Sequence, residues 1–402
     1  MSTPLNKLCE LIVDCPHSTA PDEGEGYPLI RTPNIGPGYL DLTDVHRVSK
    51  EAYDIRNARA VPQPMDLILA REAPAGNVGI IREGQWVCLG QRTVLIRPDQ
   101  KKVDPWFLNY YLNAPRQRHR LLSNANGATV SHVNMPIIRN LPVDLPSMEA
   151  QQHIASILMT YDNLIENNRR QIALLEEAAQ RLYKEWFVDL RFPNGKTSAD
   201  TAGWTQLPLT ECANVIRGRS YTSAEIDCDE GVALVNLKNL RSFGGWNDGA
   251  EKTYSGAFKE EQRVSSGDII MGVTDMTKER RLVGHVALVP DLEREAIISM
   301  DLIKLVPVQV ESLYLYAHLR FSGIAENIAL LANGTNVLHL KPQILSSVQV
   351  PIPSKGLQSD FARHMAPMVD EINLCSKRIA SLQEARDRLL PKLMSGEIEV
   401  EG

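Results

Sequence analysis

The chain has 402 residues, of which 43% are hydrophobic and 23% charged, and its formal net charge is −6. The length exceeds that of one compact domain, and the composition excludes the disordered and collagen-like classes. The acidic balance excludes a broadly basic surface, so DNA binding would depend on localised arginines and on positive charge from a partner.

Residues 1–146 are predicted to form a first globular domain. They contain short β-branched strands separated by glycine, proline and asparagine turns, and one helix near residues 104–114. Several loops carry side chains that can bond phosphates or base edges, notably "NANGATVSH" at 124–132. The candidate DNA-binding residues of this domain are Arg31, Thr32, Asn34, Arg71, Asn77, Arg92, Asn126, Gly127, Thr129, Ser131 and His132.

Residues 147–195 are predicted to form one long helix. Apolar positions alternate at steps of four and three from Ile154 to Trp186, which is the 3.5-residue repeat of a coiled-coil seam. Ser147 suits the N-cap, and the stretch 192–195, "FPNG", would end the helix. The seam is roughly 50 Å long and must be buried against a partner of similar length. Its members include Ile154, Leu158, Tyr161, Ile165, Ile172, Leu175 and Leu182, with Asn168 as a polar member.

Residues 196–353 are predicted to form a second globular domain with the same order of strands and one helix near 311–321. Its stretch "VIRGRSYTS" (215–223) places two arginines around a glycine, which permits close backbone approach to DNA, and "DMTKERRLVG" (275–284) places three cations in a turn. For any single arginine, a solvated charged turn is the alternative interpretation. The candidate DNA-binding residues are Arg217, Gly218, Arg219, Tyr221, Lys238, Asn239, Arg241, Thr274, Lys278, Arg280, Arg281, Asn333, Gly334, Thr335, Asn336 and His339.

Residues 354–402 are predicted to form a second long helix with the same seam. Phe361 lies 207 positions after Ile154, and the spacing then matches without a gap. The match extends beyond the heptads, because Asn126-Gly127 recurs as Asn333-Gly334 and Gln151 recurs as Gln358. The chain is therefore an internal duplication of one globule followed by one helix. The apolar seam positions include Phe361, Met365, Met368, Ile372, Ile379, Leu382 and Leu389, with Arg386 as a polar member.

No motif for catalysis or metal binding is complete. "DPWF" (104–107) lacks the second proline of the loop with which amino-methyltransferases hold a target amine, so Asp104 is predicted to be a helix N-cap. "NGKT" (194–197) lacks the first glycine of a phosphate-binding loop. The six cysteines have no Cys-x-x-Cys spacing, which favours reduced thiols. We expect a non-catalytic chain that binds no cofactor or metal.

The chain is expected to be cytoplasmic and to have no contact with a membrane. Its N-terminus lacks the pattern of a secretory signal. No apolar run approaches the roughly 20 residues of a membrane span.

Two variable globules alternating with two long helices resemble the specificity (S) subunit of type I restriction-modification enzymes. The resemblance covers nearly the whole chain. It is strongest in "DNLIENNRRQIALLEEAAQRLYKEWFVDLRFP", which is similar to the family's central conserved region, and in "DEINLCSKRIASLQEARDRLLPKLMSGEIEV", which is similar to the distal one. It implies an α+β fold in which two target-recognition domains are joined by an antiparallel coiled coil. Each domain would read one half of a bipartite site on double-stranded DNA, and the helices would set the gap.

The resemblance also implies protein partners. Two methylation (M) subunits would dock on the chain and supply S-adenosylmethionine and the chemistry on an extruded target adenine. Restriction (R) subunits would add cleavage that depends on ATP and Mg²⁺. The complex would methylate DNA and serve host defence.

Two other interpretations remain open. The chain could be a stand-alone DNA-binding regulator derived from an S subunit. Alternatively, the coiled coil could be a protein scaffold whose globules hold peptides. A scaffold predicts no DNA binding and leaves the glycine-arginine loops without a role.

Overall fold

The computed structural model describes residues 2–43, 45–72, 74–123, 132–193, 201 and 203–400. The chain divides into two compact units. Unit 1 comprises Met1–Glu166 and Ala380–Gly402, and unit 2 comprises Asn167–Ile379. Each unit therefore contains one globule and a part of both long helices. The division into four segments at 146/147, 195/196 and 353/354 stays a prediction.

Two long helices follow the two globules, as the heptads predict. They are α5 (Met148–Phe187) and α9 (Lys355–Ser395). Ser147 caps α5, because its Oγ accepts a hydrogen bond from the backbone N–H of Ala150 at 3.2 Å. The helix ends before the predicted "FPNG" stop, since the chain turns at Leu190, whose φ is +54°.

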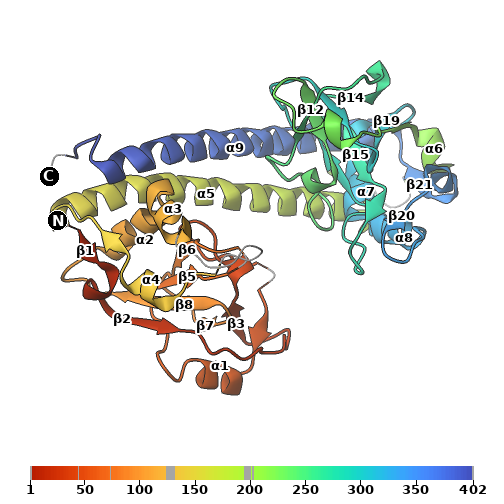
Figure 1. The fold of residues 1–402 in the computed structure, drawn as a ribbon. Helices are drawn as coiled ribbons and strands as arrows, with labels where there is room; N and C mark the ends of the chain where they lie inside the picture. Colours follow the sequence, from red (N-terminus) through yellow and green to blue (C-terminus); the bar gives the residue numbers. More distant parts are fainter. Residues whose placement is uncertain are drawn as a thin grey trace. The chain divides into compact units, whose positions relative to one another are not determined.

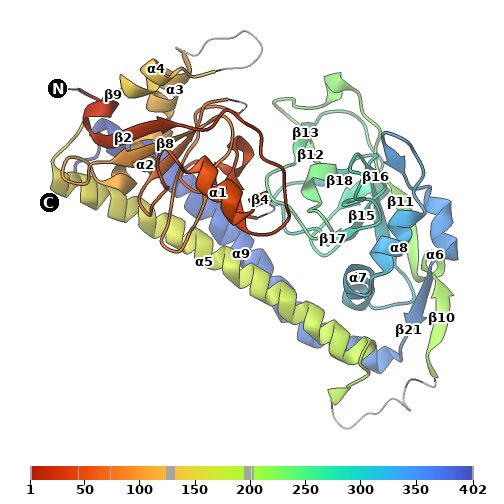
Figure 2. The same cartoon turned by 90° about the horizontal axis from the view of Figure 1, so that it is seen from below.

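In each unit α5 and α9 run side by side (Figures 1 and 2), and apolar residues of the predicted seam are buried there. In unit 1, Ile154 and Leu158 of α5 share a core with Leu393 of α9. In unit 2, Trp186 of α5 shares a core with Phe361 of α9. The beginning of each helix thus packs against the end of the other, which confirms the antiparallel pairing. All fourteen predicted apolar seam residues are buried or half-buried.

The globule of unit 1 is a mixed α/β fold built on two small sheets. Its first sheet is antiparallel in the order β2-β8-β5-β6, and its second has the order β4-β3-β7 with β3 and β7 parallel. The strands are β1 (Thr3–Pro4), β2 (Cys9–Asp14), β3 (Tyr27–Ile30), β4 (Arg47–Val48), β5 (Leu67–Ala70), β6 (Val78–Ile80), β7 (Cys88–Leu89), β8 (Thr93–Pro98) and β9 (Pro142–Val143). The helices are α1 (Lys50–Arg56), α2 (Pro105–Asn113), α3 (Pro115–Ser123), α4 (Met135–Arg139) and the 3-10 turns Leu5–Lys7 and Thr32–Asn34.

The globule of unit 2 repeats the first sheet and extends the second by one strand, β14. Its sheets have the orders β11-β19-β15-β17 and β13-β12-β18-β14, with β12 and β18 parallel, and α7 lies against β17 (Figure 2). The strands are β10 (Thr205–Pro208), β11 (Ala213–Arg217), β12 (Val232–Val235), β13 (Lys252–Tyr254), β14 (Arg263–Val264), β15 (Ile269–Gly272), β16 (Thr274–Asp275), β17 (Val286–Leu288), β18 (Ala296–Ile298), β19 (Leu302–Pro307), β20 (Leu338–His339) and β21 (Gln349–Ile352). The helices are α6 (Leu209–Cys212), α7 (Ser312–Phe321), α8 (Ile324–Leu330) and the 3-10 turns Ser223–Glu225, Leu237–Asn239, Glu260–Gln262 and Pro342–Ser347.

The duplication extends to individual hydrogen bonds. Gln151, at the start of α5, accepts a bond from the N–H of Asp104 at 3.0 Å, and Gln358, at the start of α9, accepts one from the N–H of Glu311 at 2.9 Å. Asp104 and Glu311 in turn cap α2 and α7. The predicted N-cap role of Asp104 is confirmed. The same buried glutamine therefore ties each long helix to the helix of its own globule.

The charged residue Arg386 stands in the α9 seam because it has a polar partner inside unit 1. Its guanidinium donates to Asp162 of α5 at 2.6 Å, and Asp162 also accepts a bond from the hydroxyl of Tyr110 on α2 at 2.5 Å. The polar member of the α9 seam thus faces a carboxylate rather than an apolar side chain. This network joins three helices of one unit.

Candidate nucleic-acid interface

Matching backbone hydrogen bonds identify equivalent positions at the strand ends of the two globules. The bond from Arg71 N to Arg92 O (2.8 Å) recurs from Val273 N to Asp301 O (2.9 Å). The bond from Val133 N to Arg71 O recurs from Leu340 N to Val273 O, and the bond from Cys15 N to Thr93 O recurs from Gly218 N to Leu302 O. These bonds align four side-chain positions, which we call the strand-end cluster. Its members are Asp14, Glu72, Arg92 and His132 in unit 1 and Arg217, Thr274, Asp301 and His339 in unit 2.

In unit 1 the strand-end cluster forms a closed polar network around Arg71. The guanidinium of Arg71 is buried, contacts Asp14 at 2.6 Å and donates to the ring Nε2 of His132 at 2.9 Å. Because a guanidinium can only donate, Nε2 must accept and Nδ1 carries the proton. That Nδ1 faces Glu72 at 2.5 Å, and Glu72 also pairs with Arg92 at 2.9 Å. Each charge of the network therefore has an opposite charge beside it.

The remaining described candidates of unit 1 help to shape their loops. Asn34 is buried and accepts a bond from the N–H of Arg31 at 3.1 Å, and Thr32 beside it is also buried. Asn77 donates to the carbonyl of Ile35 at 2.9 Å. Their use as DNA contacts stays a prediction. The candidates Asn126, Gly127, Thr129 and Ser131 lie outside the described residues.

In unit 2 three of the four members of the strand-end cluster line an open cavity of about 330 Å³. Arg217, Gly218, Thr274 and His339 all line it, so strands β11, β16 and β20 bring together four residues that the sequence places far apart. Thr274 donates to Asp301 at 2.9 Å. The sequence interpretation missed Lys341, which also lines the cavity, although it stands only two positions after His339.

The second Asn-Gly loop projects beside this cavity. Asn333 and His339 are joined by two backbone bonds of 3.0 and 2.8 Å, which close the loop. Gly334 has a φ of +147°, and a Cβ there would lie 1.9 Å from the carbonyl oxygen of Val337, so this turn requires glycine. Residues Asn333, Gly334, Thr335 and Asn336 are all exposed. The loop thus presents amide and hydroxyl groups to solvent.

The loop at 275–283 is shaped by a buried carboxylate. Asp275 accepts bonds from the N–H groups of Thr277 (2.7 Å) and Leu282 (2.6 Å). Burial alone would raise its pKa, but these bonds outweigh burial and lower it. Arg280 donates to the carbonyl of Ala329 at 2.9 Å, and Arg281 lies near Glu279. Lys278 remains exposed at the tip of the turn.

The other candidates of unit 2 have varied surroundings. Arg219 donates to the hydroxyl of Tyr254 at 3.1 Å, and Arg241 pairs with Glu176 of α5. Asn239 is fully buried and donates to Glu251 at 2.7 Å. Tyr221 is half-buried and Lys238 is exposed. Arg219, Arg241 and Asn239 thus have structural bonds within their own unit.

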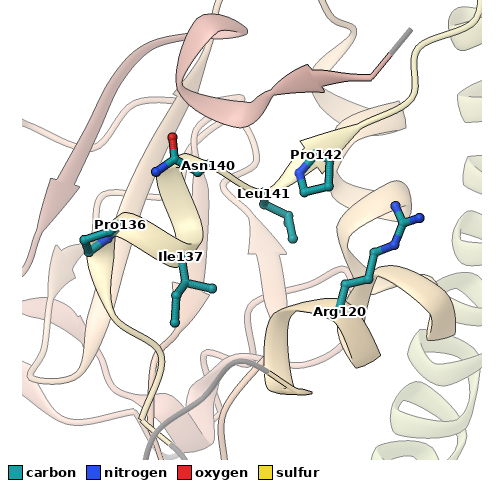
Figure 3. A pocket seen from close by; sticks show the side chains of 6 residues that line it. All are labelled: Arg120, Pro136, Ile137, Asn140, Leu141 and Pro142. Carbon is teal, nitrogen blue, oxygen red and sulfur yellow. The ribbon is translucent and has the colours of Figure 1, made fainter.

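A larger hollow in unit 1 contains none of the predicted residues. It measures about 640 Å³ and lies between α3, α4 and β9 (Figure 3). Arg120 is the charged member of its lining, which otherwise consists of Pro136, Ile137, Asn140, Leu141 and Pro142. This lining offers no pair of acid and base groups for catalysis.

The described part of the chain contains no candidate metal site and no candidate membrane span. No group of three or more His, Cys, Asp or Glu residues there could hold a metal ion. No helix in those ranges is long and apolar enough to cross a membrane. All six cysteines lie within the described ranges and are free thiols.

Comparison with known proteins gives one consistent result. Residues 7–177 match the family model described as the type I restriction modification DNA specificity domain. The MjaVIII specificity subunit of Methanocaldococcus jannaschii is 23% identical over 393 residues, which cover 94% of this chain and 88% of that protein. The MjaIX specificity subunit of the same organism is 26% identical, with 83% and 78% covered. The EcoBI specificity subunit of Escherichia coli is 28% identical over 41% of this chain and 37% of its own length.

A solved structure shares the fold. The crystal structure of the type I restriction-modification S subunit from M. genitalium matches 98% of this chain and 95% of that one with a TM-score of 0.57. Sequence identity to it is 16%, so this match supports the fold alone.

Proposed function

The chain belongs to the family of type I restriction-modification specificity subunits, and on that premise we propose that it selects the DNA sequence on which such a complex acts. Each globule reads one half of a bipartite site on double-stranded DNA. The observation that carries this proposal is the strand-end cluster. One fold occurs twice, with a histidine at one of the four equivalent positions in both units and different side chains at the other three, as two readers of different half-sites require.

The helices supply the second part of the proposal. The α5–α9 pair acts as a spacer, so its length sets the number of unread base pairs between the half-sites. At about 1.5 Å per residue, 40 helical residues correspond to roughly 60 Å.

Catalysis belongs to partner subunits in this proposal. Two methylation subunits dock on the chain and bring S-adenosylmethionine and the adenine chemistry, and restriction subunits bring ATP- and Mg²⁺-dependent cleavage. The chain itself binds no cofactor and acts in the cytoplasm. Positive charge on the partners compensates for its net charge of −6 when the complex binds DNA.

Co-expression with an adenine methyltransferase encoded beside the chain tests the proposal. Modified adenines are then mapped across the host genome. We expect a bipartite motif with a constant gap. An intact complex that leaves the genome unmodified would contradict the proposal.

A domain exchange provides the second arm of this experiment. Residues 1–146 are replaced by those of a related chain. We expect one half of the motif to change while the other half and the gap stay the same. A change in both halves would show that the globules are not independent readers.

A further inference from the structure

We propose that the cavity of unit 2 receives the major-groove edge of a guanine, with Arg217 as the side chain that reads it. This inference rests on the proposed function and adds the chemical identity of one recognised base. It also separates Arg217 from Arg219, two residues that the sequence presents as equals.

The chemistry of the cavity fits a base edge better than a phosphate. Its lining includes the apolar residues Val273, Leu302 and Leu340 as well as Arg217, His339 and Lys341. A phosphate needs only donors and charge, whereas a nucleobase presents a polar edge on an apolar ring. Arg217 and Lys341 can only donate hydrogen bonds. Guanine is the base whose major-groove edge offers two acceptors, O6 and N7, and no donor.

The backbone on both sides of Arg217 is held in place. Gly218 packs so closely on β18 and the turn after it that a Cβ would lie 1.9 Å from the carbonyl oxygen of Ser299. The N–H of Arg219 donates to the carbonyl of Ile298 at 2.8 Å, and its guanidinium donates to Tyr254. Arg217 therefore projects from a rigid strand end, which lowers the entropy lost when it binds a base.

Arg217 is also available for binding. It is exposed, and among the described residues its guanidinium has neither an ion pair nor a hydrogen bond. The equivalent position in unit 1 is Asp14, which is paired with Arg71. The charge at this position is thus reversed between the two readers, as expected of a residue that distinguishes half-sites.

The test uses the full chain in complex with its methyltransferase and duplexes that carry the mapped motif. Each guanine of the motif is replaced in turn by 7-deazaguanine, which lacks the N7 acceptor, or by inosine, which keeps O6 and N7. We expect one guanine at which 7-deazaguanine weakens binding roughly 5- to 100-fold and inosine does not. Arg217→Ala should bind the normal and the 7-deaza duplex equally weakly, and Arg217→Gln should shift the preference at that position towards adenine.

Arg294→Ala is the matched control, since Arg294 is an exposed arginine of the same unit that does not line the cavity. It should retain the full 7-deazaguanine effect. Three results would overturn the inference and leave the proposed function standing: a motif without guanine, an Arg217→Ala complex that keeps the discrimination, or one weakened equally at every position. If the wild-type complex yields no motif at all, the proposed function itself has failed.

Discussion

At the strand-end cluster, unit 1 places Asp14 and Glu72 among arginines and a histidine, whereas unit 2 places Arg217 at the edge of an open cavity. The backbone hydrogen bonds that hold these positions are the same in both units. The difference shows that the fold fixes the backbone position at the strand end and leaves the charge of the side chain there free to vary. In unit 1 the ion pair of Asp14 with Arg71 would have to open before either charge could bond a ligand.

The two units also differ in how the globule is attached to the helices. In unit 1 the polar network of Tyr110, Asp162 and Arg386 is largely shielded from solvent. In unit 2 the attachment includes an aromatic cluster around Phe361 and the exposed ion pairs of Lys377 with Asp291 and Glu293.

The largest effect is expected from deleting one heptad, Ile172 to Ala178, from α5. If two readers act at a set spacing, the deletion alters their separation and rotation and should abolish modification of the original motif. Genome-wide mapping of modified adenines measures this. A variant that still modifies the original motif with full efficiency would refute the spacer role of the helices.

Truncating a buried seam residue should destabilise the unit in which that residue lies. Phe361 is fully buried against the rings of Trp186 (5.8 Å) and Phe187 (5.0 Å), so Phe361→Ala should destabilise unit 2 by about 3–5 kcal/mol. Leu158→Ala should destabilise unit 1 by about 2–5 kcal/mol. Urea unfolding followed by tryptophan fluorescence measures both. If both variants shift one single transition equally, the units unfold together and the comparison between them fails.

A buried histidine should make unit 2 sensitive to acid. Burial lowers the pKa of His318 from 6.5 to about 4, and its Nδ1 lies 2.8 Å from the hydroxyl of Tyr183. The unfolded chain therefore binds a proton between pH 6.5 and 4 that the native state does not bind. The free energy of unfolding should therefore be highest above pH 6.5 and should decrease by about 3 kcal/mol as the pH falls through this window.

The control for this pH dependence is His318→Gln, which removes the titrating ring. Urea unfolding of both proteins at pH 7, 5.5 and 4.5 gives the difference. The equivalent position in unit 1 is occupied by Tyr111, and burial raises the pKa of its hydroxyl. The excess acid sensitivity of the wild type should therefore appear in the unfolding of unit 2. An equal loss of stability in the wild type and the variant would rule out His318 as its source.

The smallest effects are expected from the polar attachments. Arg386→Ala leaves Asp162 shielded without its cation and should destabilise unit 1 by about 1–3 kcal/mol. Lys377→Ala removes only exposed ion pairs, so unit 2 should lose less than about 1 kcal/mol. The midpoint of urea unfolding compares the two variants. If the two variants were destabilised equally, solvent exposure would not determine how much these ion pairs contribute to stability.

Local patterns in the sequence were enough to predict the architecture. The alternation of apolar residues from Ile154 and from Phe361 identified both long helices, because this period can be satisfied only by burying one helical stripe. The offset of 207 positions identified the duplication. In the structure, Gln151 and Gln358 accept the same hydrogen bond in the two copies. Helix caps such as Ser147 and Asp104 were also predictable, since a cap bonds to the backbone only three residues away.

The folded structure was needed to show which polar residues are available to a ligand. Arg71 and Arg217 are equally plausible contacts in the sequence, but the fold buries the first against Asp14 and places the second beside an open cavity. The partner of Arg386 and the place of Lys341 were likewise beyond the sequence. The physical reason is that ion pairing and burial depend on which strand ends and loops meet. Those neighbours come from distant parts of the chain, whereas helical periodicity and capping are local.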